Sequence, residues 1–208
     1  MSFFSKILPK KRVFLDFAST TPLDSDVAKV IQESQETFAN PSALYSEAIL
    51  VKEKIKEAKE KISNILNCQK EEIVFTSGGT EGNNIAMLGI FERYKTKDFT
   101  PHFVTTVIEH PAILEVCDEI ERRGGEVTRV LVGDNGIVNP KDIELAIKKN
   151  TVLVSVMYAN NEIGTIQDLV SIGKICKSKG VYFHTDACQS YTKVPIDVNK
   201  MNLDFVTL

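Results

Sequence analysis

The sequence predicts an α/β fold, with a mostly parallel sheet and helices on both of its faces. Two observations lead to this prediction. Short apolar, β-branched runs alternate with helical patterns from about residue 72 to the end of the chain. Several of the helical patterns are bounded by glycine or proline. Alternation of strands and helices of this length is typical of right-handed crossovers between parallel strands.

The composition is ordinary for a globular protein with one sizeable core: 208 residues, 43% hydrophobic and 25% charged. The formal net charge is −3 and no basic stripe appears, so we expect no nucleic-acid partner. No apolar run approaches the ~18 residues that a membrane-spanning helix needs, so we expect no membrane partner. Four scattered cysteines without a C-x-x-C pair favour a reducing cytoplasm, and we expect no metal site.

The amino-terminal part is predicted to contain a short strand at residues 13–15 and a helix at 26–38. Proline at position 41 ends this helix region, because proline disfavours helix in the residue before it. The clearest helical pattern follows at residues 48–65, where apolar residues recur at steps of three and four.

The rest of the chain is predicted to alternate. Strands are predicted at residues 72–76, 103–107, 127–132, 152–157, 181–184 and 204–208. Helices are predicted at residues 81–94, 112–123, 140–148 and 169–179. The last strand reaches residue 208 with no turn or helix to cover it, so we expect a truncated domain.

Three polar segments follow predicted strands directly: residues 77–84, 160–164 and 184–190. All three therefore fall at carboxyl ends of strands, where open α/β sheets gather their ligands. The first offers a phosphate cradle, the second a pair of amides and the third a buried carboxylate. Together they predict an anionic, aromatic, nitrogen-containing cofactor.

In the first segment, glycines allow the backbone to approach a ligand closely, and the following helix points free N–H groups at it. Thr80 sits at the predicted helix start, where its hydroxyl could cap the helix or donate to a phosphate oxygen. The segment is neither a Walker A nor a G-x-G-x-x-G motif. From this segment alone, a helix cap and a phosphate cradle are equally good interpretations.

Asp186 follows a strand apolar enough to be buried on both faces. A carboxylate there is costly unless it meets a cation or several donors, and a protonated heterocyclic nitrogen is a suitable partner. The alternative is an aspartate that caps a following helix. Cys188, two residues later, invites a nucleophile interpretation, but no local base is evident and buried cysteine mostly behaves as a small apolar residue.

Three further side chains at strand ends are candidates. The ring of His110 could stack on an aromatic cofactor or shuttle protons near neutral pH, or it could be an ordinary hydrogen-bonded loop residue. Asn161 and Gln189 are neutral donors, and each alone is more often a turn or cap residue than a ligand.

The ordered series of segments resembles the large domain of class V aminotransferase-fold enzymes, which use pyridoxal phosphate and have an aspartate aminotransferase-like fold. Within these it resembles cysteine desulfurases of the NifS/IscS type most closely. The segments that carry the resemblance are residues 13–22, 40–42, 73–81, 109–110, 160–164 and 186–190. They cover essentially the whole chain, in order.

The resemblance implies a role for each candidate in cofactor binding. Gly79 and Thr80 would bind the cofactor phosphate. His110 would stack on the pyridine ring and could take part in proton transfer, while Asp186 would keep the pyridinium nitrogen protonated. Gln189 would contact the phenolic oxygen of the ring.

The implied activity is removal of sulfur from L-cysteine, which leaves alanine and an enzyme persulfide for iron–sulfur cluster or thio-cofactor assembly. Asn161 would bind the substrate carboxylate. The implied partners are a sulfur-acceptor protein, such as an iron–sulfur scaffold, and a second copy in a homodimer. Residues 1–24 would form an N-terminal segment and residues 25–208 an incomplete large domain, without the small carboxy-terminal domain.

Two departures from the family pattern matter. Tyr45 stands where family members usually carry a histidine. The Schiff-base lysine and the persulfide-forming cysteine of the family have no counterpart among these 208 residues, since Lys193 and Lys200 match no such segment and are interpreted as solvated. We therefore expect the chain alone to be inactive.

Other interpretations remain at this stage. The chain could be a non-catalytic truncated or degenerate copy that binds cofactor weakly or pairs with an intact homologue. Another class V activity, such as selenocysteine lyase, is also possible. A dinucleotide-binding Rossmann domain is set aside, because no glycine fingerprint follows residues 13–15.

Overall fold

The computed structural model describes residues 13–17 and 19–208. The described residues divide into two compact units, one that ends at Lys52 and one that spans Glu53–Leu208. The first unit contains α1 (Ser25–Ser34) and the start of α2 (Ser46–Leu66). Asp24 caps α1, because its side chain accepts a hydrogen bond from the backbone N–H of Asp26 at 2.8 Å. The helix ends four residues before the predicted position, and single turns continue from it as far as Thr37.

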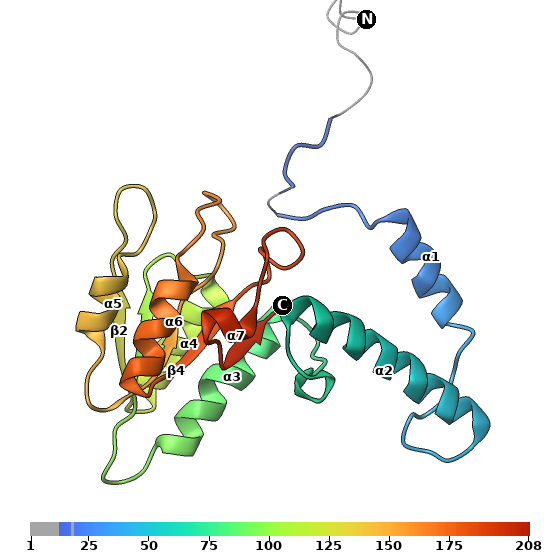
Figure 1. Cartoon of the computed structure of the whole chain (residues 1–208), viewed down its shortest axis with the longest axis horizontal. Coiled ribbons are helices and arrows are strands. Elements are labelled where there is room, and N and C mark those ends of the chain that lie inside the picture. The colour runs from blue at the N-terminus through green and yellow to red at the C-terminus, as the bar shows by residue number, and fades with distance from the viewer. Residues whose placement is uncertain (1–12, 18) are drawn as a thin grey trace, which may run out of the picture. The chain divides into compact units, whose positions relative to one another are not determined.

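The second unit is built on five strands, all paired in parallel. They are β1 (His102–Thr106), β2 (Glu126–Val130), β3 (Thr151–Ser155), β4 (Tyr182–Asp186) and β5 (Phe205–Thr207). Their order in the sheet is β2-β1-β3-β4-β5. Figure 1 labels β2 and β4 of this sheet. The predicted parallel sheet is thus confirmed.

Helices cover both faces of this sheet, as predicted. Neighbouring residues of one strand enter different apolar clusters: Phe103 and Leu153 belong to one, Val104 and Val154 to the other. The first cluster is completed by α3 (Gly79–Tyr94) and α4 (Pro111–Arg122). The second is completed by α5 (Pro140–Ala146), α6 (Leu169–Lys179), α7 (Val198–Met201) and the end of α2. No helix in the described part of the chain is long and apolar enough to span a membrane.

Two of the predicted strands are wrong. Residues 13–15 pair with no strand of the described chain, and Val13 and Leu15 are exposed. Residues 70–72 form a short 3-10 helix, η2 (Lys70–Glu72), and residues 73–76 are unpaired, with Phe75 more than half exposed. Both runs have the β-branched and aromatic residues of a strand, but a strand also needs a neighbour for its N–H and C=O groups, which composition does not reveal.

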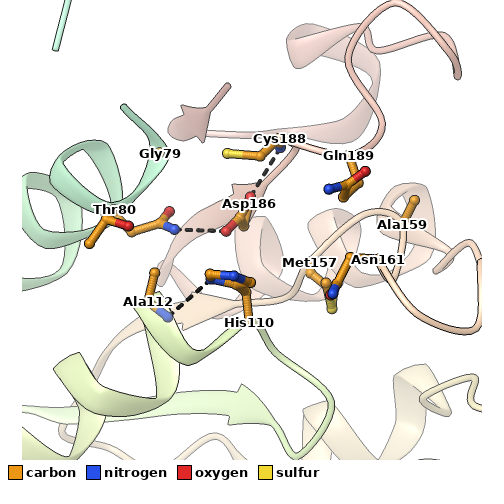
Figure 2. Close-up of a pocket in the computed structure, with 11 residues that line it drawn as sticks. Gly79, Thr80, His110, Ala112, Met157, Ala159, Asn161, Asp186, Cys188 and Gln189 are labelled. Carbon is orange, nitrogen blue, oxygen red and sulfur yellow. Dashed lines mark hydrogen bonds between the residues drawn. The ribbon is translucent and has the colours of Figure 1, made fainter. Parts of the chain in front are cut away.

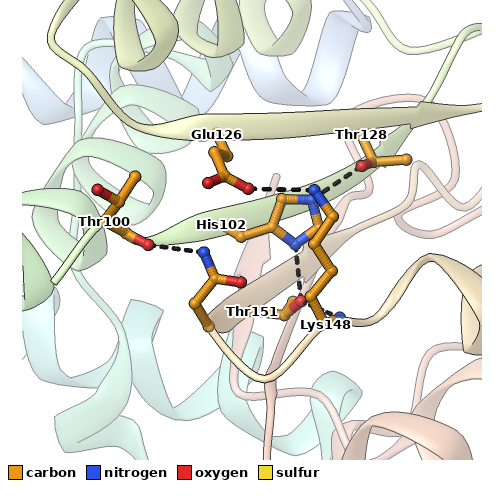
Figure 3. Close-up of polar contacts among 7 residues, drawn as sticks. Thr100, His102, Glu126, Thr128, Lys148 and Thr151 are labelled. Atoms are coloured by element: carbon orange, nitrogen blue, oxygen red, sulfur yellow. Dashed lines mark hydrogen bonds and ion pairs between the residues drawn. The ribbon is translucent and has the colours of Figure 1, made fainter.

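A buried polar cluster holds the amino ends of three strands together (Figure 3). His102, at the start of β1, is fully buried, with Nδ1 2.7 Å from the hydroxyl of Thr151 and Nε2 2.8 Å from that of Thr128. Beside it, Lys148 forms an ion pair with Glu126 at 3.1 Å. Burial and the nearby Lys148 charge lower the pKa of His102 to about 4, so the ring is neutral at physiological pH.

The strand order reverses at β1, with β2 on one side and β3 on the other. A crevice forms at the carboxyl ends of strands at such a switch point, because the connecting segments leave in opposite directions. The segments that follow β1, β3 and β4 at these carboxyl ends carry His110, Asn161 and Gln189.

The contact between α6 and α7 depends on Gly173. A Cβ there would overlap the carbonyl oxygen of Met201 and lie 2.8 Å from its carbonyl carbon. We expect Gly173→Ala to lower the free energy of unfolding by about 1–3 kcal/mol, as overpacking does.

Gly89, in the interior of α3, is the matched control: nothing lies within 4 Å of its missing Cβ. Gly89→Ala should raise stability by about 0.5–1 kcal/mol. Urea unfolding measures both, and a Gly173→Ala chain as stable as the wild type would contradict the packing described.

Candidate functional site

The six site residues predicted from the sequence line one cavity of about 210 Å³. They are Gly79, Thr80, His110, Asn161, Asp186 and Gln189. Figure 2 shows them converging from α3, the start of α4, the loop after β3 and the end of β4. The segments 160–164 and 184–190 meet here at the ends of β3 and β4, as expected, but residues 77–84 follow the unpaired run 73–76 rather than a strand. The lining is completed by Asn83, Ala112, Met157, Ala159 and Cys188.

One end of the cavity is the amino terminus of α3. The helix begins at Gly79, two residues earlier than predicted, and Gly78 occupies the N-cap position without a side-chain cap. The capping interpretation of Thr80 is therefore wrong, because Thr80 lies inside the first turn. Backbone N–H groups of a first turn have no partner within the helix and carry the positive end of its dipole, so this end of the cavity favours an anion.

The start of α3 lies very close to the turn after β4. A Cβ on Gly79 would overlap the sulfur of Cys188, and a Cβ on Gly82 would lie 2.8 Å from Cγ2 of Thr207. Glycine at these positions brings the helix start against β4 and β5. Cys188 is an exposed residue, so it is not the buried apolar cysteine of the sequence interpretation. Partial desolvation of its thiol, with the nearby Asp186 charge, raises the pKa of this thiol to about 12. A thiol that stays protonated is a poor nucleophile.

Asp186 also lines the cavity, next to α3, and is buried at the end of β4. Its Oδ2 accepts a hydrogen bond from Nδ2 of Asn83 at 2.7 Å, and its Oδ1 accepts one from the backbone N–H of Cys188 at 3.0 Å. Neither donor is charged, and no ion pair to Asp186 occurs among the described residues. Turns rather than an α-helix follow it, so the helix-capping alternative is wrong. The arrangement suits a cationic ligand atom.

His110 is both a loop residue and part of the cavity wall. It is the N-cap of α4, and its Nδ1 accepts a hydrogen bond from the backbone N–H of Ala112 at 3.1 Å. In the neutral ring the proton must then be on Nε2. The cap fixes the orientation of a ring that is otherwise exposed beside the cavity.

The two amides of the second polar segment have different places. Asn160 shapes the loop: its Oδ1 accepts from the N–H groups of Glu162 and Ile163, and its Nδ2 donates to the carbonyl of Ile108 at 3.0 Å. Asn161 is the one that lines the cavity. This difference could not be predicted, because both residues precede the same turn.

Gln189 is half-buried at the cavity, and its Oε1 lies 3.4 Å from Nζ of Lys193. Lys193 and Lys200 are exposed, as predicted. Lys200 forms an ion pair with Asp197 at 3.5 Å. No lysine lines the cavity in the part of the chain that the structure describes.

The family model for aminotransferase class V matches residues 13–208. The chain belongs to the class V aminotransferase family. It is 44% identical over 199 residues to the cysteine desulfurase IscS of Clostridium botulinum (strain Kyoto / Type A2), covering 95% of this chain and 50% of that protein. It is 40% identical over 200 residues to the cysteine desulfurase IscS of Dictyoglomus turgidum, covering 96% and 50%.

Solved structures agree with this class V assignment. The structure of "SspA in complex with cysteine" superimposes with a TM-score of 0.87 at 37% identity, covering 92% of this chain and 56% of that one. A NifS-like protein superimposes with a TM-score of 0.88 at 32% identity, covering 95% and 55%. The predicted resemblance and the predicted fold of a pyridoxal-phosphate enzyme are confirmed. The chain spans about half the length of the relatives it matches.

Two buried titratable residues, Glu109 and His184, lie next to residues of the cavity wall. No role was assigned to either of them from the sequence. Glu109, next to His110, accepts a hydrogen bond from the Thr106 hydroxyl at 2.6 Å and bonds at 3.0 Å from the N–H of Met157. Burial, with the charge of Asp186 adding, raises the pKa of Glu109 to about 8 despite these hydrogen bonds. In the sequence, the only indication of a role for Glu109 was its place beside His110 in the family-like segment 109–110.

His184 lies on the same strand as Asp186, two residues earlier. Its Nδ1 is 2.8 Å from the Ser155 hydroxyl on β3, and its Nε2 is 3.0 Å from the Thr207 hydroxyl on β5. Burial lowers the pKa of this ring to about 4, so it is a neutral link between three strands. It thereby fixes the strand that carries Asp186.

The close approach of Gly79 and Cys188 predicts energetic coupling between the two positions. Gly79→Ala should lower the free energy of unfolding by about 1–3 kcal/mol, because the added methyl group overlaps the sulfur. In a Cys188→Ala background the same substitution should cost less than half as much. Urea unfolding of the two single variants and the double variant measures this coupling. Strictly additive effects would contradict the contact.

Glu109 predicts a pH dependence of stability. An acid whose pKa rises on folding binds its proton more tightly in the native state, so its contribution to stability is complete below its unfolded value of 4.5 and is lost as the pH rises toward about 8. Relative to Glu109→Gln, the wild-type free energy of unfolding should therefore fall by on the order of a few kcal/mol across this range. Urea unfolding at a series of pH values gives the difference, and a difference that does not change with pH would show that Glu109 is not perturbed.

Proposed function

We propose that this chain is the cofactor-binding part of a pyridoxal-phosphate-dependent cysteine desulfurase. The observation that carries the proposal is one cavity lined both by an anion-binding helix start and by a buried carboxylate without a cation. A ligand that bears a phosphate and a protonated ring nitrogen satisfies both features. The IscS names of the relatives, and the cysteine bound to SspA, support L-cysteine as the substrate.

The residues present fit this cofactor. Gly79 and Thr80 would hold its phosphate through first-turn N–H groups and the Thr80 hydroxyl, and Asp186 would face its ring nitrogen. His110 would lie against the ring and Gln189 would reach its phenolic oxygen. When bound, pyridoxal phosphate supplies an electron sink for the substrate.

The chain's own side chains would then orient the reactants and move protons. Asp186 holds a proton on the ring nitrogen, since an ionised carboxylate in a buried site favours the cationic form of its partner. His110 presents Nε2, because its Nδ1 is engaged by the N–H of Ala112. Asn161 offers a neutral amide donor to the carboxylate of the substrate, and Met157 and Ala159 make the adjoining wall apolar.

Two alternatives stay open within the family. The absence of a lysine among the described lining residues favours a chain that binds cofactor without turnover, either as a non-catalytic copy or paired with an intact homologue. Selenocysteine lyase is the other, because nothing in the cavity lining distinguishes sulfur from selenium.

Further proposals follow from the family resemblance. We propose that residues 25–208 belong to the large domain, with residues 1–24 as a separate segment. A sulfur-acceptor protein, such as an iron–sulfur scaffold, would take the product sulfur, and the working protein would be a homodimer. The four unpaired, scattered cysteines fit a cytoplasmic location.

The proposal is tested with the 208-residue chain and with the product of its complete reading frame. We expect the chain to bind pyridoxal phosphate in equilibrium dialysis, and Asp186→Ala to weaken binding about tenfold or more because the ring nitrogen loses its partner. Lys200→Ala, on the exposed surface, should leave the affinity unchanged. The chain alone should release no alanine from L-cysteine, whereas the complete product should release it faster than it releases alanine from selenocysteine. A complete product that neither binds the cofactor nor forms alanine would overturn the proposal.

A further inference from the structure

Asn83 is the buried side chain that links α3 to Asp186 in the cavity wall. It lies in the second turn of α3, only 1% exposed, and its amide donates to Asp186 at 2.7 Å. The dashed line between Asp186 and the α3 side of the cavity in Figure 2 is this hydrogen bond. The first two turns of α3 thus present both backbone N–H groups and a side-chain amide to the cavity.

The other half of the Asn83 amide has no partner. Its Oδ1 is buried and accepts no hydrogen bond in the described part of the chain. Turning the amide over would place Oδ1 against Oδ2 of Asp186, two acceptors facing each other, so the observed orientation is the better of two unsatisfied arrangements. An orphaned buried carbonyl is costly, and such groups are uncommon outside functional sites. The buried Oδ1 of Asn83 therefore stays without a partner while its Nδ2 donates to Asp186.

The donor is also neutral. Asn83 from α3 and the backbone N–H of Cys188 from the turn after β4 each hold one oxygen of Asp186, so the plane of the carboxylate is fixed from two directions. A lysine or arginine in the place of Asn83 would fix it equally well but would cancel its charge. An amide fixes the carboxylate and leaves its charge available to a cation in the cavity.

We propose that Asn83 is a positioning residue that aims the ionised Asp186 at a protonated ring nitrogen in the cavity. This inference rests on the proposed function for the identity of the ring. Asn83 itself acts through Asp186, and its contribution is selectivity for a ring that contains a basic nitrogen over a ring of the same shape without one.

The test compares two phosphate ligands on the 208-residue chain by calorimetry. One is pyridoxine 5′-phosphate; the other has a benzene ring in place of the pyridine. Neither carries an aldehyde, so surface lysines do not react with them. We expect the wild-type chain to prefer the pyridine ligand about tenfold, and Asn83→Leu to reduce this preference to about twofold with little change in affinity for the benzene ligand.

Asn84→Leu is the matched control. Asn84 is the next residue of α3, and its amide donates to the carbonyl of Thr80 at 2.8 Å rather than to Asp186. Any effect of this variant on the phosphate end acts on both ligands equally and cancels in the ratio. The preference for pyridine should therefore stay at the wild-type value.

A second measurement needs no ligand. The backbone N–H of Cys188 donates to Asp186, so its protection from hydrogen exchange reports how firmly the carboxylate is held. We expect Asn83→Leu to lower this protection about tenfold at constant pH, and Asn84→Leu to leave it unchanged.

The outcomes separate this inference from the proposed function. Loss of both the ring preference and the Cys188 protection in Asn83→Leu alone supports the inference. An Asn83→Leu chain that keeps either the wild-type preference or the wild-type protection overturns it, as does a wild-type chain that binds the two rings equally. A wild-type chain that binds neither ligand, while its Cys188 protection depends on Asn83, supports the hold of Asn83 on Asp186 and contradicts the expected binding of the cofactor by this chain.

Discussion

The arrangement of the cavity depends on one buried carboxylate held by uncharged donors. Asp186 ends β4, and its two oxygens are bound by Asn83 of α3 and by the backbone N–H of Cys188. A buried charge without a cation is unfavourable unless several donors converge on it. The helix, the strand and the turn therefore have to meet at this point, and the close approach at Gly79 is what allows them to do so.

Other buried polar groups fix the strands near their carboxyl ends and near their amino ends. At the carboxyl edge, His184 links β3, β4 and β5, and Glu109 links the end of β1 to Met157 after β3. At the amino edge, His102 links β1, β2 and β3 through two threonine hydroxyls. The two histidines have partners on neighbouring strands, and Glu109 has partners at the end of β1 and just after β3, so these groups specify how the strands line up. Apolar packing alone specifies this less strictly.

Sequence patterns predicted the sheet well, and the candidate residues they selected line one cavity. Polar residues that end or closely follow a strand, such as Asp186 and His110, could be recognised locally, and parallel strands bring their carboxyl ends together. The patterns failed at residues 13–15 and 72–76, where strand-like composition meets no partner in the described chain. The roles of Asn83 and Glu109 were also missed, since a buried amide or carboxyl group gains its function from residues distant in sequence.

Gly82 gives the site a further property. Because it has no Cβ, the side chain of Thr207 on β5 reaches the first turns of α3, and the same threonine is hydrogen-bonded to His184. The edge strand of the sheet and the anion-binding helix start are therefore parts of one packed unit. By thermodynamic linkage, an anion that ordered the helix start would also stabilise the pairing of β5 with β4, and loosening of β5 would weaken anion binding by the same free energy. The packing of Gly82 against Thr207 is the contact through which the two would be coupled.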